Sequence, residues 1–166
     1  YACSEPDAGS DVAGMKTKIV KDGNEWVLTG QKRWITNGGH ASFYTGFATM
    51  DPALKHKGFV TFVVDRDAKG VSVGKKEKKL GQRASDTVDV LFDDVRIPAR
   101  NLIGSEGAGF AYQMLQFQEE RLWAAGNALR SLDKAVNDTI EYTSQREAFG
   151  RPLLDNQVIH FRLAEL

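Results

Sequence analysis

The residues best suited to acid–base chemistry lie in the stretch QFQEERLWAAG. Glu119, Glu120 and Arg121 stand there between large apolar residues and a run of small ones, within a helical pattern. Glu120 follows Phe117 by three positions and precedes Ala124 by four, which places it beside the apolar stripe of the helix. A carboxylate at that position is either a solvated helix residue or a general base held against an apolar surface. The spacing leaves both interpretations open.

Two further segments contain groups that suit a polar, aromatic ligand. The loop SEPDAGSD, at 4–11, is rich in turn residues, and such a loop can present backbone N–H groups to a phosphate or a polar ring. In GQKRWITNGG, at 30–39, Trp34 and Thr36 are two positions apart and therefore on the same face of a strand. An aromatic side chain beside a hydroxyl suits a flat heteroaromatic cofactor. A solvated turn and a core tryptophan are the alternatives.

The composition argues against several classes of function. The 166 residues contain 22 Lys and Arg and 22 Asp and Glu, a formal net charge of +0, which disfavours nucleic acid or an anionic membrane as the main partner. No apolar run approaches the roughly 20 residues of a membrane span. Cys3 is the single cysteine, so an intrachain disulfide is excluded. His40, His56 and His160 lack the spacing of a metal site, and we predict none.

The first hundred residues show the pattern of short strands. Strands are expected at 17–21, 25–35, 43–50, 59–64, 71–73 and 87–92. Asp-Gly-Asn at 22–24 predicts a hairpin turn, and Trp26, Leu28 and Trp34 share the even spacing of a half-buried strand. Many short strands without intervening helices indicate an antiparallel barrel or sandwich. Residues 98–109 are interpreted as a linker.

The hydrophobic period becomes helical at residue 108 and stays helical to residue 146, over roughly 39 residues. A second helix is expected at 156–166. The apolar stripe predicted to face the core comprises Phe117, Leu122, Ala125 and Leu129. This part is too short to bury itself, so we expect it to need further helices or another subunit.

The chain begins without methionine and ends within a helical pattern, so we expect it to be a piece of a longer protein. The predicted fold class is α+β with segregated domains. An antiparallel β-barrel or sandwich domain is expected at 1–105. The first helices of an incomplete α-helical bundle are expected at 106–166.

Six motifs occur in the order found in one protein family. They are SEPDAGSDVAGMKTK, GQKRWITNGG, LGQRASDT, FDDVRIP, GFAYQMLQFQEERLWAAG and QREAFGRPLLDNQ. Together they resemble the acyl-CoA dehydrogenase family, from the start of its middle β-domain into its C-terminal helical domain. The resemblance implies FAD as cofactor, an acyl-CoA thioester as substrate, α,β-dehydrogenation to the trans-2-enoyl-CoA, and electron transfer to an electron-transfer flavoprotein.

The resemblance also implies an assembly and a setting. A homodimer or homotetramer with FAD at the subunit interface is expected. The mitochondrial matrix and the bacterial cytoplasm both fit, as do fatty acid β-oxidation and branched-chain amino acid catabolism.

The same motifs imply roles for individual residues. The FAD-contacting set implied by the resemblance is Tyr1, Cys3, Ser4, Gly9, Ser10, Trp34, Ile35, Thr36, Arg146, Phe149 and Gln157. Ser10 is also expected to contact the acyl-CoA, whereas Arg146, Phe149 and Gln157 are expected to reach the FAD of the neighbouring subunit. The segment that lines the acyl and pantetheine channel comprises Gln118, Glu119, Glu120 and Arg121.

The implied reaction needs a base that takes the α-proton while the β-hydride goes to flavin N5. Most family members place this base in a later loop, beyond Leu166. The isovaleryl-CoA and long-chain members place it on this helix, as the glutamate of a Glu-Arg pair, which Glu120 and Arg121 reproduce. The resemblance therefore implies Glu120 as base and Arg121 as the residue that fixes the local structure or charge.

Several alternatives stay open at this point. A base supplied from beyond Leu166 is the alternative to Glu120. An acyl-CoA oxidase and a non-catalytic acyl-CoA-binding relative are alternative functions. A branched or long acyl chain, as in the citronellyl-CoA members that the chain also resembles, is a weaker expectation.

Overall fold

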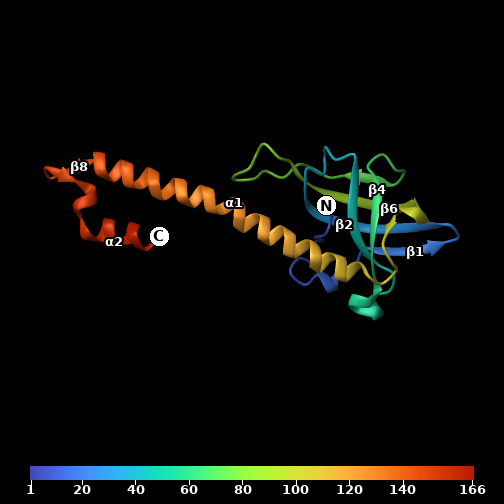
Figure 1. The fold of residues 1–166 in the computed structure, drawn as a ribbon. Coiled ribbons are helices and arrows are strands. Elements are labelled where there is room, and N and C mark those ends of the chain that lie inside the picture. The colour runs from blue at the N-terminus through green and yellow to red at the C-terminus, as the bar shows by residue number, and fades with distance from the viewer. The chain divides into compact units, whose positions relative to one another are not determined.

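The computed structural model describes all residues from 1 to 166. The chain forms two compact units, Tyr1–Met114 and Leu115–Leu166. The first unit contains a seven-stranded sheet and the start of a long helix, and the second contains the rest of that helix, a two-stranded hairpin and a second helix (Figure 1). None of the helices is both long and apolar enough to cross a membrane.

The sheet of the first unit combines two long strands with five shorter ones. They are β1 (Lys18–Asp22), β2 (Glu25–Thr36), β3 (Phe43–Thr49), β4 (Phe59–Asp65), β5 (Val71–Val73), β6 (Thr87–Pro98) and β7 (Leu102–Ile103). The order is β5-β6-β2-β1-β3-β4-β7, and every neighbouring pair is antiparallel except β1 with β3. Asp22 pairs with Glu25 across the predicted hairpin turn. The segment 98–109, predicted to be a linker, instead contributes β7, which is too short to show an alternating pattern.

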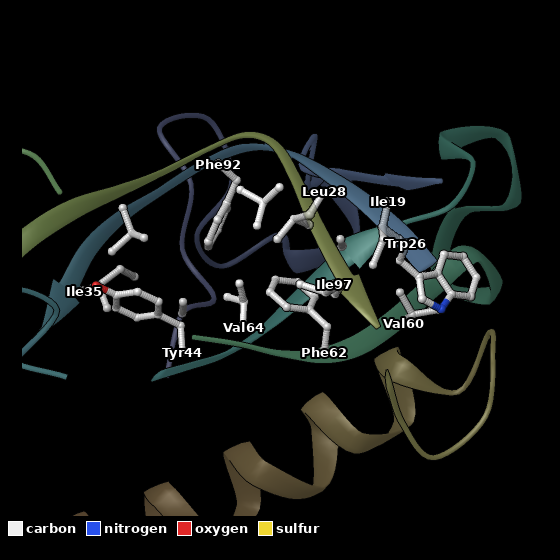
Figure 2. Packing of buried hydrophobic residues seen from close by; sticks show 14 of the residues in the cluster. Ile19, Trp26, Leu28, Ile35, Tyr44, Val60, Phe62, Val64, Phe92 and Ile97 are labelled. Carbon is white, nitrogen blue, oxygen red and sulfur yellow. The ribbon is translucent and has the colours of Figure 1, made fainter. Parts of the chain in front are cut away.

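The two ends of this sheet pack against each other. Tyr44 of β3 and Phe62 of β4 meet Phe92 of β6 edge-on, with ring centroids 6.5 Å and 5.9 Å apart. Figure 2 shows these rings in one apolar cluster with Ile19 and Leu28. Because β5 and β7 remain unpaired edges, the sheet is open and sandwich-like, and it does not close into a barrel.

A β-bulge in β2 changes which of its residues face the core. Lys32 pairs with Val90, but Ile35 pairs with Val88, so β2 has one more residue here than β6. An extra residue reverses the alternation of buried and exposed side chains beyond it. Trp34 is consequently 58% exposed, although its even spacing predicted a half-buried position. The predicted phase of the strand is correct up to Lys32 and wrong after it.

A second bulge explains why β6 is longer than the sequence indicated. Leu28 pairs with Val95, but Gly30 pairs with Phe92, so here β6 has the extra residue. Asp94 lies at this bulge with a left-handed φ of 48°. The predicted strand ended at residue 92 because two consecutive aspartates, Asp93 and Asp94, are typical of the start of a loop. The apolar alternation resumes after the bulge and the strand continues to residue 98.

The second unit follows the predicted order of helices. α1 is a 37-residue helix, close to the predicted span of 108–146, and α2 is shorter. The elements from the helix onward are α1 (Gly109–Gln145), β8 (Glu147–Ala148), β9 (Arg151–Pro152) and α2 (Gln157–Glu165). The sequence pattern did not reveal the small hairpin of β8 and β9, because strands of two residues carry no period.

The apolar side of the second unit is not covered within this chain. Leu122 and Leu129, both predicted to face a core, are 76% and 68% exposed. A groove of about 520 Å³ runs between α1 and α2, lined by Leu132, Ala135, Val136, Thr139, Val158, Ile159, Arg162, Leu163 and Leu166. A helix face this apolar is normally packed against another element. That further helices or another subunit cover it remains a prediction.

Candidate active site

The N-terminal loop is fixed to two strands of the sheet. The Ala2 N–H donates to the Thr45 carbonyl at 2.8 Å. Two residues later, the Ser4 carbonyl accepts from the Arg33 N–H at 2.7 Å. Ser4 and Trp34, both predicted cofactor contacts, therefore lie at the same part of the sheet.

A buried ion pair holds this loop. The Lys32 ammonium lies 2.8 Å from the Glu5 carboxylate, and the two side chains are 0% and 4% exposed. The ammonium also donates to the Cys3 carbonyl at 3.2 Å. The carboxylate accepts in addition from the backbone N–H groups of Lys16 and Thr17, at 2.6 Å and 3.1 Å. The pair thus joins the N-terminal loop, the segment that leads into β1, and β2.

Burial and ion pairing shift the pKa of each of these two groups in opposite directions. Burial favours a higher pKa for Glu5, but the charge of Lys32 and the hydrogen bonds from Lys32, Thr17 and Lys16 outweigh it and hold the pKa below its ordinary value. Burial lowers the pKa of Lys32, and Glu5 offsets part of that effect. All the polar partners of the ammonium are acceptors: the Cys3 carbonyl, the Glu5 carboxylate and the Met15 sulfur.

The lowered pKa of Glu5 predicts a stability that depends on pH. The unfolded chain, with a glutamate pKa of about 4.3, binds the proton more tightly than the folded protein does. The contribution of Glu5 is therefore complete above about pH 4.3 and is lost as the pH falls through the folded-state pKa. Urea unfolding of the wild type and of Glu5→Gln across this range is expected to show a difference that shrinks on acidification. A difference that does not change with pH would contradict the assignment.

Trp34 has an unusual backbone conformation. Its φ is 59°, in the left-handed region, which costs a bulky residue about 1–3 kcal/mol. The Arg33 guanidinium lies over the indole, 5.4 Å from the ring centroid. Thr36 is exposed like Trp34, whereas Ile35 between them is buried. The strand therefore presents an indole and a hydroxyl outward, and Ile35 can offer a ligand only its backbone groups.

The remaining predicted contacts of the N-terminal loop differ in accessibility. Gly9 and Ser10 are exposed, whereas Cys3 is buried, so Cys3 too can offer mainly its backbone. The Tyr1 hydroxyl accepts a hydrogen bond from the Gln113 amide of α1. Gln113 was not predicted as a site residue. It is almost fully buried, its Oε1 has no hydrogen-bond partner, and its one sequence signal is a polar residue within an apolar helical turn.

On α1, the predicted base is exposed. The Glu120 Oε1 accepts from the Gln116 Nε2 at 3.3 Å. Arg121 does not pair with Glu120; its guanidinium lies 5.3 Å from the centroid of the Phe117 ring, one turn earlier. The Glu-Arg pair is therefore adjacent in sequence without forming an ion pair.

A shallow groove lies along this part of α1. Its volume is about 660 Å³, and it is lined by Gln116, Glu119, Glu120, Trp123 and Ala124. Trp123 was not predicted as a site residue, although its spacing of three from Glu120 places both on one helix face. Gln118 and Arg121 do not line the groove. Glu120 is exposed even with Trp123 beside it, and its role as base remains a prediction.

The residues predicted to reach a neighbouring subunit surround the small hairpin. Arg146, Phe149 and Gln157 all have exposed side chains. Phe149 and Gly150 form the two-residue turn between β8 and β9, with φ of 54° and 77°, as in a type I′ turn. Phe149 is 105% exposed, so it makes no packing contact that would explain a phenylalanine there.

Phe149→Gly is expected to cost the fold little. Glycine removes the left-handed penalty of about 1–2 kcal/mol and loses no buried surface, but it adds unfolded-state entropy of about 0.5–1 kcal/mol. The free energy of unfolding should stay within about 1 kcal/mol of the wild type, while the FAD content of the complete protein should fall, as expected from the FAD contact that the motif implies for Phe149. Denaturant unfolding and flavin content after gel filtration measure the two effects. A loss of stability well beyond that range would show that Phe149 packs within the fold.

The sequence matches two family models that together cover most of the chain. Residues 1–95 match the middle domain of acyl-CoA dehydrogenases, and residues 107–166 match their C-terminal domain. The sandwich-like β-domain and the helices that follow it therefore correspond to two domains of a dehydrogenase family. The chain belongs to the acyl-CoA dehydrogenase family, as its motifs predicted.

Individual relatives are similar over the full chain. A probable medium-chain specific acyl-CoA dehydrogenase 2, mitochondrial, from Caenorhabditis briggsae is 43% identical over 169 residues, which cover 100% of this chain and 41% of the relative. The crystal structure of an acyl-CoA dehydrogenase from Geobacillus kaustophilus has 42% identity and a TM-score of 0.92, covering 99% of this chain and 44% of that one. A prolyl acyl carrier protein oxidase has 31% identity and a TM-score of 0.95, covering 99% and 43%. The chain spans about two fifths of the length of the curated relatives it matches.

Proposed function

We propose that the complete protein is an FAD-dependent acyl-CoA dehydrogenase that converts an acyl-CoA thioester to the trans-2-enoyl-CoA. The observation that carries this proposal is the bulge that turns Trp34 outward. Thr36 is exposed on the same face, and the Ser4 carbonyl accepts a hydrogen bond from the N–H of Arg33, the residue before Trp34. A bulky residue kept in a left-handed conformation lowers stability, and such strain is concentrated at ligand sites. Membership of the family supports the same activity.

The residues of the first unit fit a flavin by their chemistry. The Trp34 indole offers a flat surface for a heteroaromatic ring, and Thr36, Ser4 and Ser10 offer hydroxyl groups to its polar edge. Backbone groups of the loop and strand complete the set, which comprises Tyr1, Cys3, Ser4, Gly9, Ser10, Trp34, Ile35 and Thr36. FAD, when bound, supplies the hydride acceptor that no side chain can provide.

A second subunit completes the proposed cofactor site. Arg146, Phe149 and Gln157 are exposed around one hairpin, which suits residues that contact the FAD of a neighbouring copy. We therefore propose a homodimer or a homotetramer with the cofactor at the interface. The strained, solvent-exposed Phe149 is the strongest support for this arrangement.

Glu120 is the residue we propose to remove the α-proton of the thioester. Its carboxylate is held only by a 3.3 Å hydrogen bond from Gln116, so it is free to accept a proton. In the complete protein, the acyl chain and the elements that cover α1 would exclude water from it and strengthen it as a base. Gln118, Glu119 and Arg121 are proposed to line the acyl and pantetheine channel with it.

Electron-transfer flavoprotein is the proposed electron acceptor, and molecular oxygen is the second candidate. The oxidase is favoured by one observation, the similarity of this chain to a prolyl acyl carrier protein oxidase. We further propose the division into a β-domain at 1–105 and a helical domain at 106–166. The mitochondrial matrix or the bacterial cytoplasm is the proposed compartment.

Turnover of the purified complete protein with a series of acyl-CoA thioesters tests this function. Enoyl-CoA should form when electron-transfer flavoprotein or a dye acceptor is present, with little oxygen consumed in its absence. Oxygen consumption and peroxide formation without the flavoprotein would assign the oxidase. Binding of acyl-CoA without product under either condition would assign a non-catalytic relative.

A further inference from the structure

A gain in stability does not explain why the Lys32–Glu5 ion pair is buried. Taking two charges out of water costs several kcal/mol per ion, and apolar residues of similar volume are often as stabilising as a buried pair or more so. Lys32 is fully buried in β2, whose other buried side chains are the apolar Trp26, Leu28 and Ile35. A charge at this position is therefore better explained by the contacts that it directs.

Those contacts converge on the predicted cofactor loop. Besides Glu5, the Lys32 ammonium donates to the Cys3 carbonyl at 3.2 Å and lies 3.4 Å from the Met15 sulfur. The peptide that follows Cys3 leads directly to Ser4, whose own carbonyl is hydrogen-bonded to the residue after Lys32. Two consecutive peptides of the loop are thus held by two consecutive residues of β2.

The same two residues of β2 lead into the bulge. Lys32 is the last residue paired in register with β6 before Trp34 turns outward. A shift of the loop relative to Lys32 would change the distance between Ser4 and the indole. The pair is consequently placed to keep the loop and the indole at a fixed spacing.

We propose that Lys32 and Glu5 are positioning residues that set the spacing between the cofactor loop and Trp34, and so the affinity for FAD. The inference rests on the proposed function, since it assumes that loop and indole contact the same FAD molecule. Neither side chain touches the ligand, because both are buried. They act through the backbone of Cys3 and Ser4 and through β2.

The double variant Lys32→Met, Glu5→Gln tests the proposal in the complete FAD-loaded protein. Met packs against Met15 without a charge, and Gln can still accept from the Lys16 and Thr17 N–H groups, so the variant should melt within a few degrees of the wild type. The FAD dissociation constant should rise about ten-fold, the equivalent of one net hydrogen bond. Lys32→Met alone should also destabilise the fold, because it leaves an unpaired buried carboxylate.

Lys16→Met is the matched control. It removes an ammonium from the same region, but from an exposed pair with Asp7 at 2.8 Å, and should change neither melting nor FAD affinity. A double variant that binds FAD as tightly as the wild type would overturn the proposal, and so would one that fails to fold. A wild-type protein that binds no FAD at all would instead overturn the proposed function.

Discussion

Replacement of Glu120 by glutamine is expected to slow flavin reduction by acyl-CoA by about 10²–10⁴-fold, the usual contribution of a positioned general base. Glutamine has nearly the same shape and can keep a hydrogen bond to Gln116, but it cannot take the α-proton. FAD binding should be unchanged, since Glu120 is not among the predicted cofactor contacts. Anaerobic rapid mixing of the FAD-loaded variant with substrate measures the rate.

The chain offers a closely matched control on the same helix. Glu141 accepts from the Gln145 amide at 3.3 Å, the distance that joins Gln116 to Glu120; both pairs are four positions apart, with the order of glutamate and glutamine reversed. Glu141→Gln should therefore leave the rate of flavin reduction unchanged. A Glu120→Gln variant that bleaches at the wild-type rate would move the base to a residue beyond Leu166.

Two tryptophans of β2 should respond to alanine in opposite ways. Trp26→Ala is expected to lower the free energy of unfolding by about 3–5 kcal/mol, because the side chain is 3% exposed and lies in the core cluster (Figure 2). Trp34→Ala should change it by far less, since its indole is mostly in solvent. The second variant should instead weaken FAD binding.

Denaturant unfolding and FAD titration of the two variants separate these effects. Trp26 is buried and Trp34 is exposed because the bulge between Lys32 and Ile35 changes the phase of the strand. Equal losses of stability for both substitutions would mean that Trp34 also packs in the core. That result would remove the main support for the cofactor surface.

The alternation of apolar residues predicted most strands of the sheet to within two residues. It failed at the two bulges, because a bulge adds one residue without a sequence signal strong enough to show it. For β6, the Asp-Asp pair resembled a loop, so half of the strand was missed. For β2, the failure concealed the outward position of Trp34, which only the resemblance to a family indicated.

The candidate site was predicted less completely than the fold. The Glu5 and Lys32 charges were not predicted to meet, since residues 27 positions apart in sequence come together only through the sheet. Gln113 and Trp123 were missed because their signals, a polar residue in an apolar turn and a tryptophan three positions from Glu120, also occur in ordinary helix residues. The exposed position of Glu120 could not be predicted, because its spacing fits a solvated helix residue and a covered base equally well.

The most direct test of the acyl-CoA dehydrogenase assignment is anaerobic addition of a saturated acyl-CoA to the FAD-loaded complete protein. We predict that the visible absorbance of the flavin is lost and that one enoyl-CoA forms for each flavin reduced. Binding of the thioester without loss of flavin absorbance, in a protein shown to hold FAD, would contradict the account.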